Sequence, residues 1–270
     1  MSQQQLAVGI VQITGQGTKY TLPKGVEIEE SDCIKLKFFP SITTSLVLYI
    51  EKPVTIMLEL GEGAVVEMGE CHQNAGERLI HINAEKNARL TRSVVCIDAP
   101  QTKIEANIHL QQGARVEDNE VFFLNETEHL DLKTNLHHQS GKSFGNVLIK
   151  GALIEKANAL TRGTLHIAKA ANQSETSLQE HLLLLSKEAK ANAVPSLEIE
   201  ANNVIAKHAA SVTNLNQEQI FYLTSRALPE HEARKMVVQG FLTSCLNRMP
   251  TDSIQQLFTK EFEAKWNRSN

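Results

Sequence analysis

Thiol and imidazole groups are the side chains of this sequence best suited to chemistry, because thiolates and imidazoles bind iron and other transition metals. The chain holds 4 cysteines and 10 histidines. The cysteines are dispersed and form no CxxC pair, which favours reduced thiols in a cytosolic protein over a disulfide framework. They are Cys33, Cys71, Cys96 and Cys245.

Two pairs of potential metal ligands are adjacent in the sequence, Cys71-His72 and His137-His138. Adjacent residues of a strand point to opposite faces, so neither pair can readily chelate one ion. Cys96 lies in the apolar run SVVCI, which is typical of a buried, inert thiol. We therefore expect structural roles for these five residues.

His208 is the stronger candidate for a metal ligand. It follows strand-like residues in the run VIAKHAA, shortly before the sequence becomes helical. A surface or interface histidine is the alternative role. Upstream, Glu198 and Glu200 could act as acid–base groups or iron ligands, but solvated strand positions are the default for such carboxylates.

The sequence motifs of hydrolytic enzymes are missing. The short runs GQG at 15–17 and GEG at 61–63 lack the GK[ST] continuation of a phosphate-binding loop, and no GxSxG nucleophile elbow occurs. We therefore expect a chain that does not hydrolyse nucleotides and is not an enzyme.

Residues 1–212 are rich in short runs of β-forming residues. A loose repeat links GEGAVVEM (61–68), EKNARLTR (85–92) and QQGARVED (111–118), with a Gly or Asn before each alanine. The step from Ala64 to Ala88 is 24 residues, and the step from Ala88 to Ala114 is 26. Such periods indicate stacked units that bury their apolar faces together, with a left-handed turn residue at each corner. The expected strands include Leu6–Ile13, Ser45–Ile50, Val54–Leu60, Ile104–Leu110, Val121–Leu124 and Leu130–Leu136.

These observations predict a mainly β fold, a β-helix or solenoid. A β-sandwich is the alternative, because it also combines many strands with regular turns. In the strand-like run after Pro195, Leu197, Ile199 and Ala201 alternate with polar residues, which predicts one buried face.

Residues 213–270 have a different pattern, which predicts a small α-helical domain after a β domain of residues 1–212. Asn216 suits a helix N-cap with Gln219 three residues on, and Pro229 suits the start of a second helix, before acidic Glu230 and Glu232. Two sets of mostly apolar residues at helical spacing follow, and each predicts the buried face of one helix. Thr251 or Asp252 can cap the last helix. The sets are Ala233, Met236, Val237, Phe241 and Cys245, and then Ile254, Leu257, Phe258, Phe262 and Trp266.

Composition excludes several classes of partner. The formal net charge is −4, spread along the chain, which gives no electrostatic footprint for nucleic acid or an anionic membrane. No apolar run approaches the ~20 residues that span a bilayer. The N-terminal residues MSQQQLAVGIVQITG lack the features of a signal peptide, so we expect a cytoplasmic protein.

Four runs carry a resemblance to a known family. They are HLLLLSKEAKANAVP (181–195), LEIEANNVIAKHAA (197–210), QIFYLTSRALPEHEA (219–233) and Gly240-Phe241. In this order they resemble the C-terminal core of the SufB/SufD proteins, scaffold components of the SUF machinery for iron–sulfur cluster assembly. The runs cover roughly a third of the chain, far more than a short motif.

The resemblance implies a right-handed parallel β-helix and a functional histidine at His208, near a SufB–SufD interface where clusters are assembled. The sequence departs from the family at three positions. Ala206 stands where members often have cysteine, and Ala209 and Ala189 stand where the SufB type has a glutamate and a key cysteine. Clusters generally need several thiolates. These departures therefore indicate a SufD-like accessory chain that binds no cofactor stably. An iron ion or a cluster would bind only transiently, at an interface with a partner.

The family also implies partners. Its helical region docks the ABC-type ATPase SufC, so Phe221, Tyr222, Arg226 and Phe241 are the expected contact residues, with a core position as the alternative for the aromatic ones. The scaffold is expected to pair with a SufB-like protein or with a second copy of itself. The helical N-terminal region common in SufD proteins is expected to be lacking, because β-like sequence begins almost at once.

Two other functions stay open. One is a homodimeric member of the family that acts as an interaction protein without assembling clusters. The other is a β-helix enzyme acting on polysaccharide, since that fold hosts lyases and hydrolases. The low aromatic content, 5%, argues against the second, because such enzymes use aromatic platforms.

Overall fold

The computed structural model describes residues 8–249 and 252–268, so Leu6 and Ala7 of the first expected strand and the cap candidate Thr251 lie outside the described residues. The fold is mainly β, followed by three helices. The strands are β1 Val8–Thr14, β2 Gly17–Thr21, β3 Val26–Glu30, β4 Ile34–Phe38, β5 Thr43–Ile50, β6 Val54–Leu60, β7 Val65–His72, β8 Gly76–Ala84, β9 Arg89–Cys96, β10 Thr102–Leu110, β11 Arg115–Leu124, β12 His129–His138, β13 Phe144–Leu153, β14 Asn158–Ile167, β15 Glu175–Leu184, β16 Lys190–Ile199 and β17 Ile205–Asn214. The helices are α1 Gln217–Thr224, α2 Glu230–Leu246 and α3 Asp252–Arg268.

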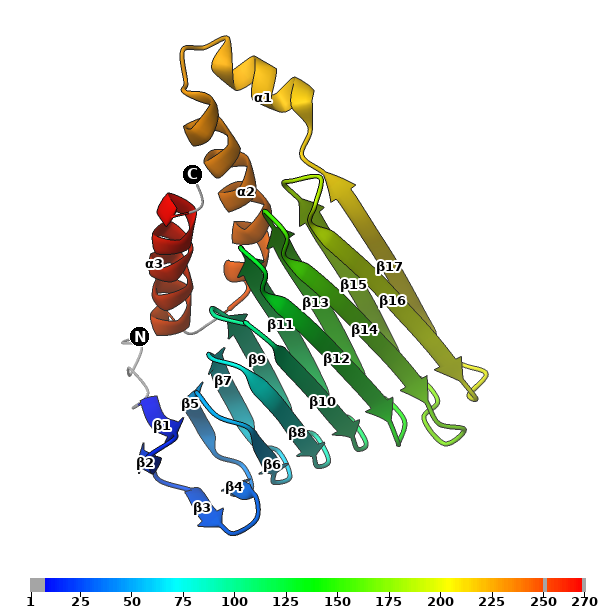
Figure 1. Ribbon diagram of the computed structural model, residues 1–270. Helices are drawn as coiled ribbons and strands as arrows, with labels where there is room; N and C mark the ends of the chain where they lie inside the picture. The colour runs from blue at the N-terminus through cyan, green and yellow to red at the C-terminus, as the bar shows by residue number, and fades with distance from the viewer. Residues whose placement is uncertain (1–7, 250–251, 269–270) are drawn as a thin grey trace, which may run out of the picture.

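From β4 onward, successive strands alternate between two sheets. Sheet A has the order β17-β15-β13-β11-β9-β7-β5-β1-β2, and sheet B has the order β16-β14-β12-β10-β8-β6-β4-β3 (Figure 1). From β4 onward every pair is parallel, while β1–β2 and β3–β4 are antiparallel hairpins at the N-terminal end. A chain that crosses between two parallel sheets at every strand is a solenoid with two strands per coil. The predicted β-helix is therefore confirmed over the β-sandwich, whose sheets are antiparallel; its handedness stays an expectation.

The coils lengthen along the chain. Thr43 pairs with Val65, 22 residues later, whereas Glu175 pairs with Ile205, 30 residues later. The predicted repeat marks the coil corners: Gly63, Asn87 and Gly113 have φ of 68°, 58° and 70°, and each directly precedes one of the repeat alanines. The left-handed backbone expected for Gly or Asn at these corners is thus observed.

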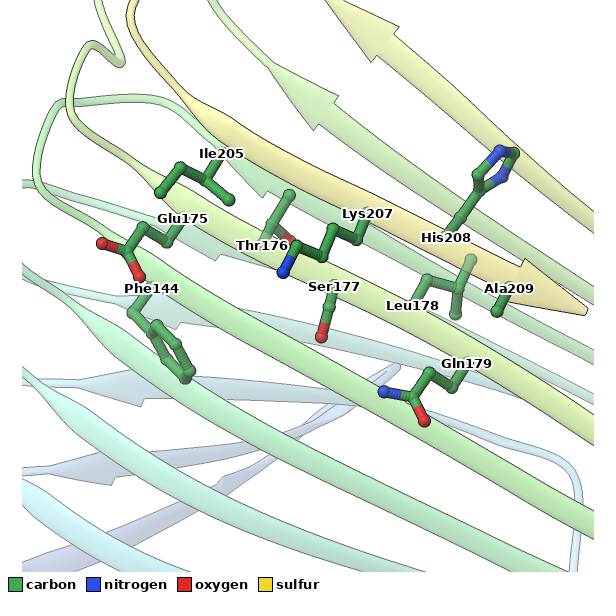
Figure 2. A pocket seen from close by; sticks show the side chains of 10 residues that line it. All are labelled: Phe144, Glu175, Thr176, Ser177, Leu178, Gln179, Ile205, Lys207, His208 and Ala209. Carbon is green, nitrogen blue, oxygen red and sulfur yellow. The ribbon is translucent and has the colours of Figure 1, made fainter.

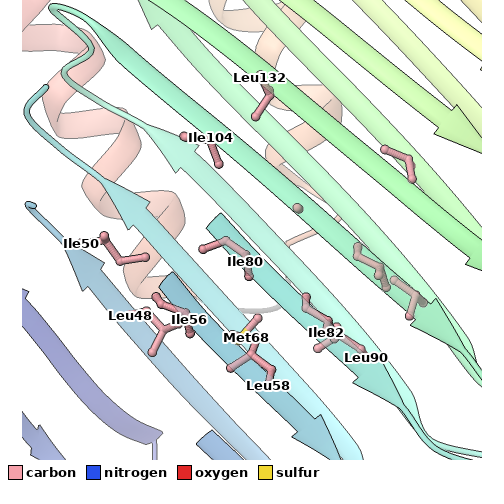
Figure 3. Packing of buried hydrophobic residues seen from close by; sticks show 14 of the residues in the cluster. Leu48, Ile50, Ile56, Leu58, Met68, Ile80, Ile82, Leu90, Ile104 and Leu132 are labelled. Carbon is pink, nitrogen blue, oxygen red and sulfur yellow. The ribbon is translucent and has the colours of Figure 1, made fainter. Parts of the chain in front are cut away.

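The interior of the solenoid is a core of aliphatic side chains from alternate positions of both sheets. Leu48, Ile56, Leu58, Ile80 and Ile82 are each 0% exposed and pack between the sheets (Figure 3). Full burial of one such side chain contributes about 1.5–3 kcal/mol to stability. The strand alternation read from the sequence therefore identifies the inward face.

The three helices follow β17, which ends at Asn214, close to the boundary expected between residues 212 and 213. Asn216 caps α1 as predicted, since its side-chain Oδ1 accepts hydrogen bonds from the backbone N–H of Glu218 and Gln219. Helix α2 contacts β11 and β13, and α3 contacts β7 and β9, so both lie on the outer face of sheet A (Figure 1). The helices and the outer side chains of sheet A share a second apolar core.

The face that α2 buries differs from the prediction. Ala233 and Cys245 are buried as expected, together with Val238 and Leu242, which were not predicted. Val237 and Phe241 are only half-buried, and Met236 is 52% exposed. The stripe that faces sheet A is set by Ala233 and Leu242, and Met236 lies off this stripe, toward α1. On α3 the prediction is confirmed, because Ile254, Phe258, Phe262 and Trp266 are buried and Leu257 packs partly against them.

Candidate functional site

The last coil leaves strands unpaired at one end of the solenoid. Within the described residues, β16 in sheet B and β17 in sheet A each pair with one strand only. Apolar side chains of this coil remain exposed: Ile199 by 44%, Ile205 by 53% and Val212 by 41%. The predicted burial of Ile199 is therefore wrong, because no coil formed by the described residues stacks on β16.

His208 lies in β17, opposite Leu178 of β15. Its side chain is exposed and borders a pocket of about 580 Å³ that is also lined by Ser177, Gln179 and Lys207. Figure 2 shows its ring pointing away from the side on which Lys207 and Gln179 lie, as strand alternation requires. The sequence candidate for a metal ligand thus stands at the inward edge of the open end.

The residues around His208 do not form a metal centre by themselves. Among the described residues, no three His, Cys, Asp or Glu side chains are arranged to hold a metal ion. Burial raises the pKa of the Cys96 and Cys245 thiols to about 12, so both stay protonated and are poor ligands. The role of His208 as a ligand remains a prediction, and any metal there needs donors from elsewhere.

The adjacent pair Cys71-His72 points to opposite faces, as expected. Cys71 lies in the core between sheet A and the helices, while the His72 ring is inside the solenoid, with Nε2 3.0 Å from Oε2 of Glu70. Burial raises the pKa of the Cys71 thiol and lowers the pKa of the His72 imidazole, so both side chains are neutral at neutral pH.

A buried ionic cluster inside the solenoid was missed by the sequence reasoning. Arg92 donates from Nε to Glu70 Oε1 at 2.7 Å and from Nη1 to Asp118 Oδ2 at 2.9 Å and Glu120 Oε1 at 3.0 Å. Thr134 Oγ1 donates to the same oxygen of Glu120 at 2.8 Å. The repeat itself carried the signal, because Met68, Arg92 and Asp118 hold the same inward position of successive units.

The cluster holds more carboxyl groups than its one arginine can neutralise. Burial raises the pKa of a carboxyl, but at Glu70 the contacts with Arg92 and His72 outweigh burial and lower the pKa to about 2. At Glu120 burial and the neighbouring Asp118 prevail and raise the pKa to about 8. The interior therefore retains a proton at neutral pH.

The four residues expected to contact the ATPase differ in their exposure. Phe221 and Tyr222 on α1 are 74% and 56% exposed, and the Arg226 guanidinium lies 5.1 Å from the Tyr222 ring centroid. Phe241 on α2 is half-buried, with Lys150 Nζ of β13 4.4 Å from its ring centroid. The first three residues form an outward surface, and Phe241 helps to seat α2 on sheet A.

A groove of about 540 Å³ lies between α1 and α2 beside Tyr222. Leu223, Met236 and Val237 form its apolar floor, and Gly240 lies on its wall. Met236 and Val237 were placed by the sequence on the buried face of α2, so this groove was not predicted. Its residues belong to two helices whose mutual angle is not visible in the sequence.

Two surfaces thus distinguish this solenoid: the open last coil and the groove between α1 and α2. In the part of the chain that the structure describes, no helix is long and apolar enough to cross a membrane. The fold and these surfaces define the class, a parallel β-solenoid with an unpaired terminal coil and a layer of helices on one sheet.

The particular family follows from comparison with known proteins. The SufBD core domain of SUF system FeS cluster assembly matches residues 54–241, so the chain belongs to the SufB/SufD family. The match runs from β6 through the groove into α2 and includes both surfaces. The resemblance seen in the sequence is thereby confirmed.

Curated relatives agree with this assignment. The chain is 31% identical over 132 residues to the iron–sulfur cluster assembly protein SufD of Bacillus subtilis (strain 168), covering 49% of this chain and 30% of that protein. It is 28% identical over 192 residues to an iron–sulfur cluster assembly SufBD family protein of Mycobacterium tuberculosis (strain ATCC 25618 / H37Rv), covering 68% and 48%. With SufD of Escherichia coli (strain K12) it shares 29% over 131 residues, covering 48% and 31%. The matches thus span less than half the length of these relatives.

Proposed function

We propose that this chain is a SufD-like, non-hydrolytic scaffold in iron–sulfur cluster assembly, which pairs through its open coil and docks a SufC-like ABC ATPase on its helices. The observation that carries the proposal is the unpaired, apolar last coil in a chain of the SufB/SufD family. An edge strand offers free N–H and C=O groups, and proteins without a partner usually protect such an edge. The occupant is a SufB-like chain or a second copy of this one.

The direction of the free backbone groups on β17 can be read from its hydrogen bonds. The N–H groups of Ile205 and Leu215 donate to carbonyls of the β15 strand region, Ser174 and Leu184. Alternate residues of a strand face opposite neighbours, so the N–H of even-numbered residues such as Ala210 points away from β15. Ala210 is exposed and available to a new strand.

Substitution at Ala210 tests the pairing. Ala210→Pro removes one outward N–H and leaves the bonds to β15 in place, so the monomer keeps its fold but loses affinity for a SufB-like partner or for its own copy. Ala210→Val keeps the N–H and serves as the matched control. Light scattering of the chain alone and mixed with a SufB-like protein identifies the occupant. A wild-type chain that stays monomeric both alone and with the SufB-like protein contradicts pairing.

The ATPase is expected on the groove between α1 and α2. Exposed Tyr222 and Met236 line the groove beside Leu223, and aromatic and Met side chains are enriched where proteins bind. A scaffold held at its helices while its last coil is paired can pass the motion of a nucleotide-driven ATPase to that interface. Iron or a cluster is the cargo at the interface, and the imidazole of His208 is available there.

Loss of the groove should abolish docking. Met236→Lys or Tyr222→Ala weakens binding of a SufC-like ATPase about tenfold or more in calorimetric titration. Tyr20→Ala is the control, because Tyr20 is similarly exposed, by 51%, but lies on the N-terminal hairpin. Absence of binding by the wild-type chain, alone and with a SufB-like partner, would refute the docking proposal.

A further inference from the structure

Three histidines stand in register on the outer face of sheet B. His109 of β10 pairs with His137 of β12, which pairs with His166 of β14. The ring centroids of His109 and His137 are 4.7 Å apart at an interplanar angle of 12°, and those of His137 and His166 are 5.6 Å apart at 51°. The steps of 28 and 29 residues exceed the 24 and 26 residues of the repeat recognised in the sequence, so the stack was not predicted.

Two glutamates lie next to the histidine stack, at the β16 edge of sheet B. His166 pairs with Glu198 of β16, and Glu200 follows that strand directly. His166 Nε2 lies 3.4 Å from Glu200 Oε1. Two ligand atoms that each lie about 2.1 Å from one metal ion are about 3.0–3.4 Å apart, so this pair is already at ligand spacing.

The outer end of this row is open to solvent. The side chains of His166 and Glu200 are 27% and 60% exposed, so an ion can reach them from solvent.

We propose that His166 and Glu200, joined by His137, form a site for one divalent transition-metal ion such as Zn²⁺ or Co²⁺. Since no three such side chains of the described residues already converge, His137 must turn its ring toward His166 Nε2, and water fills the remaining positions. Imidazole and carboxylate ligands suit these borderline ions. The site lies on the outside of sheet B, apart from His208 in sheet A, and does not depend on the proposed scaffold function.

Titration of the full chain with Co²⁺ tests the site, because tetrahedral or five-coordinate Co²⁺ bound to imidazole has a visible absorption that hydrated Co²⁺ lacks almost entirely. The background variant Cys33→Ser removes the one cysteine that is not buried. One equivalent of Co²⁺ is expected to bind, displaced by Zn²⁺. His166→Ala is expected to weaken binding about tenfold or more, and His137→Ala and Glu200→Gln are expected to weaken it less.

His81→Ala is the matched control, since His81 lies half-buried on the same face but pairs with Asn107 outside the stack. Circular dichroism and thermal unfolding without metal show that each variant folds. Retention of wild-type affinity in His166→Ala, equal loss in His81→Ala, or no absorption change at millimolar Co²⁺ overturns the proposal.

Discussion

The two sheets of the solenoid share an aliphatic interior but differ in their outer faces. The outer face of sheet A is apolar where α2 and α3 cover it, and its inner face carries the charged cluster around Arg92. The outer face of sheet B carries polar ladders, such as Lys133 with Glu105 and Asn135 with Asn107, and its inner face is mainly aliphatic. The inward face is mainly apolar in both sheets, so the outer faces differ because helices cover sheet A and solvent covers the ladders of sheet B.

This contrast shows where the fold depends on tertiary contacts. Sheet B satisfies its outer side chains by itself, through cross-strand pairs and water. Sheet A needs the helices, which arrive about a hundred residues later in the chain, to bury Val121, Phe123 and Leu148. Removal of a helix contact should therefore destabilise the protein more than removal of a ladder contact.

The largest effect is expected at the anchor of α3. Lys265 Nζ lies 2.6 and 2.7 Å from the two carboxylate oxygens of Glu128, and both side chains are buried. Lys265→Met leaves a buried carboxylate without its cation and should lower the free energy of unfolding by about 3–5 kcal/mol. Urea denaturation measures the loss. The double variant Lys265→Met with Glu128→Gln should lose less stability than Lys265→Met alone. An equal or greater loss in the double variant would show that packing, not charge, holds α3.

The next effect concerns the inner face of sheet A. The pKa of Glu120 is about 8 in the folded protein and near its ordinary value of 4.5 when unfolded. Between these values the folded state holds a proton that the unfolded state has lost, so stability falls as pH rises, by up to about 1.4 kcal/mol per pH unit. Glu120→Gln should flatten this slope between pH 5 and 8, as chemical denaturation at several pH values can show. An unchanged slope would assign it to other groups.

A smaller effect is expected where α3 approaches sheet A most closely. A Cβ added at Gly69 would lie 2.5 Å from Ile254 Cγ1, so Gly69→Ala forces this contact apart and should cost about 1–3 kcal/mol. Because Ile254→Ala removes Cγ1, the double variant should lose less than the sum of the two single losses. Gly240→Ala is the control, because a Cβ there meets nothing within 4 Å. A similar loss in both alanine variants would argue against a close helix contact.

The smallest effect is expected on sheet B. Asn135 Nδ2 donates to Asn107 Oδ1 at 2.8 Å in a ladder on its outer face. Asn135→Ala should lower the free energy of unfolding by about 0.5–1.5 kcal/mol, because water can replace the lost partner. Thermal unfolding of Asn135→Ala and Lys265→Met under the same conditions compares the stability lost at each sheet. A greater loss in Asn135→Ala would reverse the contrast between them.

The sequence predicted what depends on neighbours along the chain. The repeat gave the coil corners, alternation gave the inward face, and Asn216 gave the start of α1. The repeat also placed Arg92 and Asp118 at equivalent positions, a signal that was not used, whereas the stack of His109, His137 and His166 lies outside the repeat that was recognised. The sequence could not place Met236 or Ile199, because their exposure depends on the angle between two helices and on the absence of a further coil on β16 among the described residues.

The lengthening of the coils limits how copies of this chain can assemble. The first coil measures 22 residues and the last 30, and among the described residues the narrow end carries two antiparallel hairpins. Head-to-tail growth into a fibre would have to join a wide coil to these hairpins. The pairing that we propose would instead join two wide ends, which would limit the assembly to two members.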